Sequence, residues 1–506
     1  MKCALIIPAW QREEIFPRET KGSQINYWQP LGILYVAAML RNAGHEVRFY
    51  NGAFLSNAAI LRQVAEFAPG FAGIYSTTFG WDKAMQLAAA LKRLNPAVFT
   101  CAGGPFPIAM QERCLAECVH FDAVGTGEGE LTVPELVACL ESGRGLEGVL
   151  GIAFRRGHEI VKNPPRPLIE NLDALPFPAR DLLHDPWSYR PPPGTYRRLP
   201  VTVLMTARGC DRNCLFCFQI DRKRRAGTRG VRFRSVENVL AEIEHCLALG
   251  YREIKILDDT LAADYDRAMQ IAIEIKRRRL DFTWFASACV NQVDERLLHA
   301  FKEAGCWAIL LGGESGVQKN LNALRKGSTV EDTRAAVRAA KRAGLRVSMP
   351  FLFGIPGETY EDGLKTIEFA LELNPDLANF HCITPFPGTD LYDKIEKYGA
   401  ASRDLRDYTY QGTAFVPYTM TREQIHELRQ LAFRRFYSRP KFLVRALLRL
   451  RSLNDLRAAA VGVKSLFWLW MRSGLFRRYR DRRRAAPAPR APTPDIPSPA
   501  PGRAAG

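Results

Sequence analysis

The sequence predicts an α/β protein made of an N-terminal Rossmann-like domain, a partial (β/α)6 barrel of the TIM type and a helical C-terminal region. Two observations predict this class: short apolar segments alternate with segments of helical periodicity, and a proline-rich stretch divides the alternation into two series. The chain has 506 residues, enough for two to four domains, and 47% of them are hydrophobic and 25% charged. This composition excludes a disordered, collagenous or disulfide-dense protein.

The first series covers residues 1–150. Its apolar segments are expected to form strands at 4–8, 46–50, 73–76, 99–103 and 123–125, with helices such as 31–43 and 81–94 between them. Strands that alternate with helices of this length form βαβ units, which build a parallel, doubly wound sheet. Residues 151–198 are rich in proline, and we expect a β-rich edge there followed by an extended linker.

The second series covers residues 199–400. Six strands are expected, at 201–205, 253–257, 283–287, 308–312, 346–353 and 379–384. Six βα repeats suit part of a barrel, whose chemistry should lie at the carboxyl ends of the strands. The chain then turns helical and basic over 401–484, and the Ala/Pro-rich residues 485–506 are expected to be a disordered tail.

The formal charge of +18 lies mostly in one segment. Residues 434–484 hold sixteen Lys and Arg against two Asp, so the remainder of the chain is close to neutral. Apolar and cationic residues interleave in 433–437, 442–449 and 465–471. Such helices either lie on a membrane surface or pack their apolar side against the barrel. Nucleic-acid binding is not expected, because no recognition motif accompanies the charge.

The sequence shows no membrane-spanning or secretory segment. No stretch has the roughly 18 uninterrupted apolar residues of a spanning helix, and the apolar run at the N-terminus is too short for the core of a signal peptide. We therefore expect a cytoplasmic protein, in which residues 434–484 would supply any contact with the inner face of the membrane.

Three of the twelve cysteines form a close cluster directly after the first expected barrel strand. The spacing is Cys210-x3-Cys214-x2-Cys217. Three thiolates on one tight loop can bind three irons of a [4Fe-4S] cluster and leave the fourth iron open to another ligand. The alternatives are buried structural cysteines or a zinc site that borrows a histidine, although the nearest downstream histidine, His245, falls in an expected helix.

With Phe216 before the third cysteine, this loop resembles the signature of the radical S-adenosylmethionine (SAM) superfamily. Four later segments, each at the end of an expected strand, match the family in order: 257–260, 312–316, 353–359 and 385–389. The resemblance implies that Asp258 or Asp259 contacts the methionine part of SAM, that Glu314 contacts the ribose hydroxyls, and that Gly354 lies near the adenine. From the residues alone, Asp259 could instead cap a helix, and Glu314 could form a salt bridge to Lys326 or Arg325.

Glycine-rich turns also follow the strands of the first domain. Together with 30–34 and 43–47, the segments Gly103-Gly104-Pro105 and Gly125-Thr126-Gly127-Glu128 resemble the cobalamin-binding domain that precedes many radical SAM barrels. The resemblance then covers residues 1 to about 400 and implies cobalamin beside Gly103, Gly104, Gly125 and Glu128. A Rossmann-like domain that binds a nucleotide, or nothing, is the alternative. The Asp-x-His-x-x-Gly motif is absent, so His45 is expected at the surface and cobalt without a protein histidine.

The resemblance implies a cobalamin-dependent radical SAM enzyme with three cofactors, a [4Fe-4S] cluster, SAM and cobalamin. Methylation of an unactivated carbon in a hydrophobic or natural-product small molecule is the expected reaction, with flavodoxin or ferredoxin as electron donor. Oxidative cyclisation or ring rearrangement of a tetrapyrrole or polycyclic lipid is an alternative. A nonenzymatic iron-sulfur or nucleic-acid-binding protein is the alternative of another class.

Overall fold

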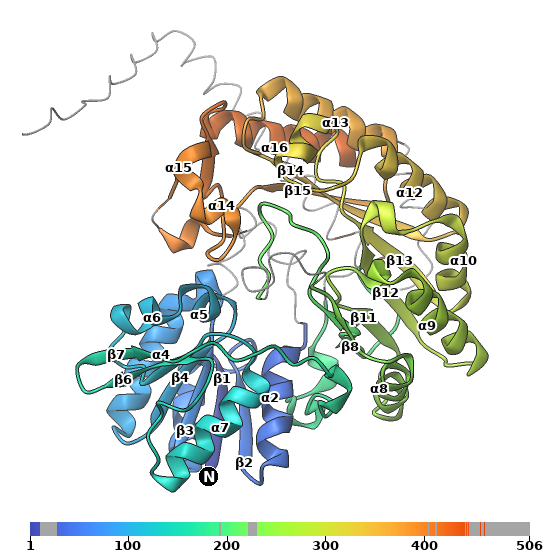
Figure 1. Ribbon diagram of the computed structural model, residues 1–506. Coiled ribbons are helices and arrows are strands. Elements are labelled where there is room, and N and C mark those ends of the chain that lie inside the picture. The colour runs from blue at the N-terminus through green and yellow to red at the C-terminus, as the bar shows by residue number, and fades with distance from the viewer. Residues whose placement is uncertain are drawn as a thin grey trace, which may run out of the picture.

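The computed structural model describes residues 1–10, 28–191, 194–220, 230–402, 404–409 and 412–440, and the single residues 442, 444, 456 and 460. Within these residues two large sheets lie next to each other (Figure 1). The first belongs to the N-terminal part of the chain, and the second curves around the loop that carries the three cysteines.

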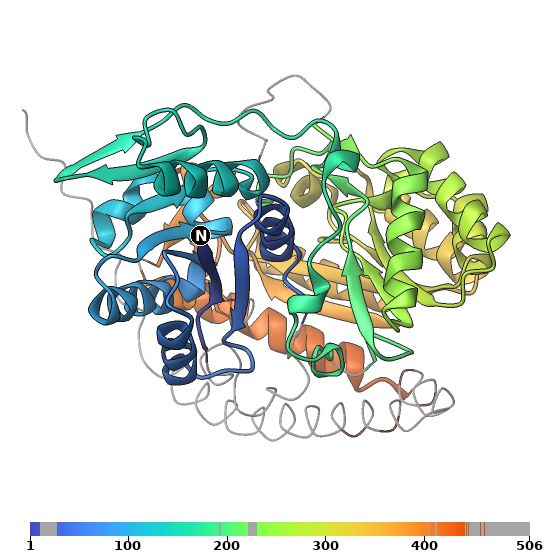
Figure 2. The same ribbon diagram turned by 90° about the horizontal axis from the view of Figure 1, so that it is seen from below.

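The first sheet has seven strands in the order β2-β1-β3-β4-β5-β6-β7. The strands are β1 (Lys2–Ile7), β2 (Glu46–Asn51), β3 (Phe71–Tyr75), β4 (Phe99–Gly103), β5 (Ala123–Gly125), β6 (Ile152–Arg156) and β7 (Glu159–Lys162). β1 to β5 are parallel, and β6 and β7 add an antiparallel hairpin at one edge (Figure 2). This hairpin lies inside the segment 151–198, so the sheet extends beyond residue 150, where the sequence analysis ended the first domain.

Helices cover both faces of this sheet, as a doubly wound fold requires. One apolar core lies under α2 and α7, and the other lies under α3 to α6. The helices are α2 (Leu31–Asn42), α3 (Asn57–Phe67), α4 (Trp81–Leu94), α5 (Pro105–Met110), α6 (Glu112–Glu117) and α7 (Gly129–Ser142). The Rossmann-like expectation is confirmed.

The second sheet is a six-stranded open barrel. Its strands are all parallel and follow one another in chain order: β8 (Val201–Leu204), β11 (Glu253–Ile256), β12 (Thr283–Ala288), β13 (Cys306–Leu311), β14 (Arg346–Phe353) and β15 (Leu377–Cys382). The outer face packs on a core shared with the helices α8 (Val236–Ala248), α9 (Tyr265–Arg277), α10 (Glu295–Glu303), α12 (Val330–Arg342), α13 (Tyr360–Leu373) and α16 (Arg422–Tyr437). The partial (β/α)6 barrel is confirmed.

Shorter elements complete the barrel. A two-stranded ladder joins β9 (Ala207–Arg208) to β10 (Arg232–Phe233), and a second joins β16 (Gly399–Ala401) to β17 (Phe415–Pro417). The short helices α11 (Gln318–Ala323), α14 (Asp390–Asp393) and α15 (Ile395–Tyr398) lie in the connections after β13 and β15.

Capping residues in the sequence determine where several barrel helices begin. Thr329 with Asp332, Thr359 with Asp362, and Thr421 with Gln424 form capping boxes at the starts of α12, α13 and α16. In each box the two side chains bond backbone N–H groups that the first helical turn leaves unpaired. Thr359 ends the segment 353–359, so part of that motif serves to start a helix.

The C-terminal helix α16 packs on the barrel. Phe436 is fully buried, and the rings of Phe433 and Phe436 lie 5.2 and 5.9 Å from the ring of Phe380 on β15. For residues 433–437, the structure therefore shows the packing alternative. The stretch 465–471 and the tail 485–506 lie outside the described residues, as does most of 442–449. Within the part that the structure describes, no helix is long and apolar enough to cross a membrane.

Candidate functional site

The cysteine loop follows β8 and β9 and lies inside the curve of the barrel sheet (Figure 1). The Leu215 N–H donates to the Leu324 carbonyl, and the Leu391 N–H donates to the Leu215 carbonyl, each at 2.9 Å. Gln292, after β12, donates to the Asp211 carboxylate at 3.0 Å. These bonds tie the loop to three different βα connections, so its position is fixed by the barrel as a whole.

The three thiols predicted as cluster ligands lie on this anchored loop. The Cys217 N–H donates to the Cys214 carbonyl at 3.3 Å and closes a tight turn. Cys214 is buried, whereas Cys210 and Cys217 are partly exposed. Among the described residues, no three His, Cys, Asp or Glu side chains gather around a single-ion position.

A buried lysine brings positive charge to the loop. Burial lowers the pKa of Lys326, but Glu314 and the nearby sulfurs of Cys214 and Cys289 outweigh burial and raise it. A neighbouring cation stabilises thiolates, the form of cysteine that binds metal. The loop therefore has the donor set and the charge environment that a [4Fe-4S] cluster requires.

Cys289 is a fourth thiol at this site, which the sequence analysis did not assign to it. It directly follows β12, and its sulfur hydrogen-bonds to Cys210, which lowers the pKa of Cys289. Its position after a barrel strand is the signal that could have identified it, because barrel chemistry gathers at the carboxyl ends of strands.

The two adjacent aspartates after β11 have different environments. Asp258 is buried, and its carboxylate accepts from the Thr206 N–H at 2.6 Å, from the Thr206 hydroxyl and from the Ala207 N–H at 3.2 Å. Asp259 is exposed, and its charge acts on Cys210. The helical turn that follows begins at Thr260 rather than Asp259. Asp258 thus holds the end of β8, while Asp259 lies beside the thiol loop.

Glu314 forms the salt bridge that was the alternative to ribose contact. Its carboxylate lies 2.7 Å from Lys326 Nζ, while Arg325 pairs with Asp390 instead. Glu314 has a φ of +52°, and its backbone bonds to Pro350 and Leu352 on β14. The backbone of β14 therefore holds Glu314 in place. Its carboxylate pairs with Lys326, which in turn lies near the Cys214 sulfur of the thiol loop.

Phe216 and Gly354 both lie against apolar side chains near the carboxyl end of β14. Phe216 packs against the cluster that contains Leu352 and Ile355. Gly354 has a φ of +81°, and a Cβ there would lie 3.2 Å from Ile425 of α16. Its N–H donates to Glu358 at 2.7 Å. Glycine at 354 is therefore required by the turn and by helix packing, whatever ligand lies nearby.

The glycines of the first domain leave its carboxyl edge bare. Among the described residues, a Cβ on Gly103 would meet nothing within 4 Å, and a Cβ on Gly125 would meet only the Ala102 carbonyl, at 3.8 Å. Gly104 differs, because its φ of +102° and the Ser76 carbonyl 2.6 Å from its Cβ position demand glycine there. Open space over the ends of β4 and β5 fits a flat macrocycle such as cobalamin.

Glu128 and His45 are both engaged by partners within the protein. Glu128 is a buried ion-pair partner of Arg208 and Arg232 of the barrel region, both at 2.9 Å. His45 was expected at the surface, and this was wrong: it is 9% exposed, with Nδ1 3.2 Å from the Met1 amino nitrogen. The turn before β2 places His45 at the amino edge of the sheet, opposite Gly103.

The two candidate cofactor edges meet at Gly388. A Cβ on Gly388, in the loop after β15, would lie 2.8 Å from the Phe218 ring and 3.0 Å from Ala109. Phe218 follows Cys217, and Ala109 lies on α5, which begins directly after Gly104. The glycine edge of the first domain is thus next to the cysteine loop and the mouth of the barrel.

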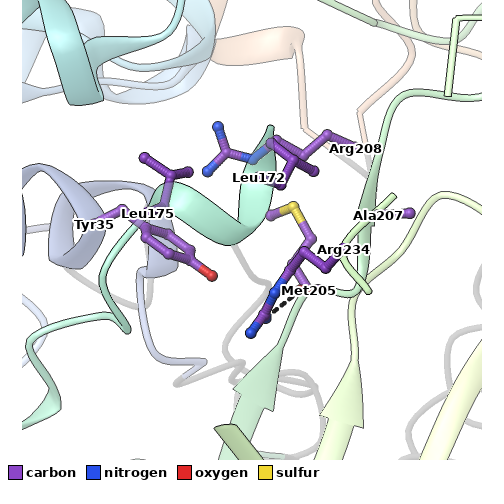
Figure 3. A pocket seen from close by; sticks show the side chains of 7 residues that line it. All are labelled: Tyr35, Leu172, Leu175, Met205, Ala207, Arg208 and Arg234. Atoms are coloured by element: carbon purple, nitrogen blue, oxygen red, sulfur yellow. Dashed lines mark hydrogen bonds between the residues drawn. The ribbon is translucent and has the colours of Figure 1, made fainter. Parts of the chain in front are cut away.

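An arginine-rich junction connects the two sheets at the base of the loop. Arg208 pairs with Glu128 and, at 2.6 Å, with Glu130. Tyr35, Leu172, Leu175, Met205 and Arg234 surround a hollow beside Arg208 (Figure 3). Its volume is about 10 Å³, room for about one water, so the junction is packed and holds no cofactor-sized space.

Comparison with known proteins identifies both domains. The family model of the radical SAM superfamily matches residues 204–370, and that of the B12 binding domain matches residues 24–137. An uncharacterized methyltransferase of Pyrococcus horikoshii is 37% identical over 422 residues, 82% of this chain and 89% of that protein. This chain belongs to the radical SAM superfamily and carries a B12-binding domain. Its cofactors are accordingly the iron-sulfur cluster, SAM and cobalamin, as the sequence analysis expected.

Two further matches place this radical SAM protein among its relatives. The anaerobic magnesium-protoporphyrin IX monomethyl ester cyclase of Rubrivivax gelatinosus is 28% identical over 430 residues, 82% of this chain and 75% of that enzyme. The solved structure of the cobalamin-dependent SAM radical enzyme OxsB, with aqua-cobalamin and SAM bound, covers 96% of this chain and 81% of its own. The TM-score is 0.68 at 15% identity, which shows a shared fold.

Proposed function

We propose that this radical SAM protein is a C-methyltransferase that methylates an unactivated carbon of a small molecule held in the barrel. The contact at Gly388 carries the proposal, because Ala109 of the B12-binding domain and Phe218 of the cysteine loop meet there. A methyl donor on one side and a hydrogen-abstracting radical on the other both need access to the same carbon. The juxtaposition of these two edges supports that arrangement.

Bound together, the reduced cluster and SAM would supply a 5′-deoxyadenosyl radical, and methylcobalamin would supply the methyl group. Cys210, Cys214 and Cys217 would hold the cluster, and the bare ends of β4 and β5 at Gly103 and Gly125 would hold the macrocycle. The proposal also keeps the domain boundaries expected from the sequence: a cobalamin-binding domain at 1–150, a linker at 151–198, the barrel at 199–400, a basic helical region at 401–484 and a tail at 485–506.

The surrounding residues support the binding and shielding that radical chemistry needs. Glu314, which pairs with Lys326 beside the cysteine loop, can accept hydrogen bonds from SAM. Asp259 is exposed beside Cys210. The apolar cluster of Leu215, Leu352, Ile355 and Ile383, with Phe216 packed on it, would keep water from the reacting carbon.

Oxidative cyclisation is the second candidate function, and the 28% identity to a cyclase supports it. Both reactions begin with hydrogen abstraction, so they share the site and differ in the product. A cyclase product lacks a methyl group from SAM.

We further propose flavodoxin or ferredoxin as the reductant, and membrane-surface contact through residues 434–484.

Labelled SAM tests the proposal. The anaerobically reconstituted protein, with cobalamin and a flavodoxin reducing system, is incubated with CD3-labelled SAM and a small-molecule extract of cells that lack the gene. We expect a product that carries the CD3 group by mass spectrometry. It should be absent with Cys210→Ala/Cys214→Ala/Cys217→Ala and present with Cys114→Ala, a buried core cysteine used as the matched control. An unlabelled, newly cyclised product would favour the second candidate instead.

A further inference from the structure

Lys255 projects from β11 into the barrel. In the ladder it pairs with Val203 on β8 and Phe285 on β12. Its neighbours Ile254 and Ile256 pack in the outer core under the helices. Successive side chains of a strand point to opposite faces, so Lys255 faces the interior, where the substrate would lie.

Two aromatic rings flank the ammonium group of Lys255 within the part of the chain that the structure describes. Nζ lies 4.4 Å from the centre of the Trp28 ring and 5.1 Å from that of Phe285. Trp28 belongs to the B12-binding domain, so both domains contribute to this environment. Burial lowers the pKa of Lys255 to about 8. Within the described ranges, no carboxylate or other hydrogen-bond acceptor pairs with this lysine.

The nearest acid of the same strand is already fully bonded. Glu253 also faces the interior, and its carboxylate accepts from the Arg197 and Arg198 N–H groups at 2.7 and 2.8 Å. It further accepts from the Thr283 hydroxyl at 2.6 Å and the Trp307 indole at 2.8 Å. Glu253 thus closes the amino end of the barrel and leaves the charge of Lys255 uncompensated.

The rest of the inner wall carries apolar side chains, such as Trp307 and Leu310, together with polar ones that are partly accessible. Ser287, Ser348, Asn379 and His381 alternate with side chains of the outer core, and each is half-buried. A buried cation without a counter-charge is costly, and rings offset only part of that cost. An anionic ligand beside Lys255 would supply the missing partner.

We propose that Lys255 binds an anionic group of the substrate, a carboxylate or a phosphate, inside the barrel. This rests on the proposed function, since it assumes that the substrate occupies the barrel. Asp258 lies three residues after Lys255, just beyond the end of β11, so the anion would sit about 10 Å below Asp258, at ~3.3 Å per residue. The substrate is then an elongated molecule with its reacting carbon near the mouth and its anionic group near Lys255.

A binding titration tests the lysine without any turnover. Saturation-transfer NMR follows propionate and methylphosphonate, as carboxylate and phosphate-like probes, on the cobalamin- and cluster-loaded protein. We expect at least one probe to bind, with at least tenfold weaker binding to Lys255→Met and Lys255→Gln and near-normal binding to Lys255→Arg. Lys276→Met, on the outer face of α9, removes the same charge and should bind like the unmodified protein. Equal affinity in the Lys255→Met or Lys255→Gln protein, or no binding of either probe to the unmodified protein, would overturn the proposal.

The labelled product provides the second readout. We expect it to carry an acidic group, and Lys255→Met to raise KM at least tenfold. The control Lys276→Met should leave both KM and SAM-dependent deoxyadenosine formation unchanged. A CD3-labelled product with no anionic group overturns the role of Lys255 but leaves methyl transfer standing. Absence of any labelled product overturns methyl transfer, and the probe titration still decides the role of Lys255.

Discussion

The Glu128 carboxylate lies 2.9 Å from a guanidinium nitrogen of Arg208 at the junction of the two sheets, where Glu128 is buried and Arg208 is partly buried. Glu128 belongs to the glycine-rich turn of the B12-binding domain, and Arg208 stands two residues before Cys210. One ion pair therefore connects the segment after β5 to the base of the cysteine loop.

Replacing Glu128 with Ala should destabilise the protein strongly, because buried Arg232 would lose the carboxylate it pairs with and Arg208 would keep only Glu130. Loss of one partner of a buried pair costs about 3–5 kcal/mol. Urea unfolding of the apoprotein measures the change. Arg277→Ala, which breaks an exposed pair with Glu274, should cost about 1 kcal/mol or less. Similar losses in the two variants would contradict the role of this junction.

The same pair has a pH signature. Burial raises the pKa of Glu128, but the hydrogen bonds and charges of Arg232 and Arg208 outweigh burial and hold it below its ordinary value of 4.5. A lowered folded-state pKa gives stability that is present above 4.5 and is lost as the pH falls through the folded value. The stability difference between the unmodified protein and Glu128→Gln should therefore shrink on acidification below 4.5.

The cluster should survive loss of Cys289 but not of Cys210. Three ligands on one loop suffice for the cluster, and Cys289 comes from a different connection. Iron content and visible absorbance after anaerobic reconstitution distinguish the variants. Cys289→Ala should retain both, and Cys210→Ala should lose most of both. Loss of iron in Cys289→Ala would show that this thiol is a ligand.

Gly103 and Gly104 are adjacent glycines whose replacement should have different effects. Gly103→Val should keep its melting temperature, because open space surrounds the new side chain, and should bind cobalamin at least tenfold more weakly. Gly104→Ala should instead lose stability, since its Cβ would lie 2.6 Å from the Ser76 carbonyl at a φ of +102°. Thermal unfolding and cobalamin titration separate the two effects. Unchanged affinity in Gly103→Val would place the macrocycle elsewhere.

Cobalamin should be bound without histidine on cobalt. His45 is buried against the Met1 amino group at the amino edge of the sheet, so His45→Ala should leave the spectrum of the bound cofactor unchanged. Electron paramagnetic resonance of the Co(II) form detects a nitrogen ligand directly. Nitrogen splitting that disappears in His45→Ala would refute the prediction.

The basic C-terminal segment should bind anionic lipid. A truncation after Pro440 removes most of its charge and leaves Phe436 and Tyr437 on the barrel, which a cut at residue 433 would not. Each Lys or Arg near an anionic surface contributes about 1 kcal/mol, less in salt. Sedimentation with phosphatidylserine vesicles at low salt should show binding of the full chain and loss of binding on truncation. A full chain that stays in the supernatant contradicts the prediction.

The sequence was sufficient to predict the strands and the residues at their carboxyl ends. Phe99–Gly103, Ala123–Gly125 and Arg346–Phe353 occur with the predicted bounds, because apolar runs between turns specify strands locally. The orientation of neighbouring polar side chains was not predictable. Asp258 turns away from the thiol loop because Thr206, 52 positions earlier, offers it two donors.

Contacts between the domains could not be predicted from the sequence either. The Glu128 carboxylate pairs with Arg208 and Arg232, whose positions depend on how the two sheets dock, so the sequence analysis could not identify these partners. Lys255 stands in an apolar strand pattern, and its meeting with Trp28 depends on the same docking. Patterns within one segment cannot specify such partners.

The closure of the barrel floor by Glu253, Thr283 and Trp307 has a kinetic consequence. These paired side chains occupy the amino end of the inner face, and the B12-binding domain stands beside the opposite end at Gly388. Under the proposed function, substrate would enter by that opposite end before SAM covers it, and product would leave after the spent nucleoside. We therefore expect an ordered kinetic scheme in which excess SAM slows the first encounter with substrate.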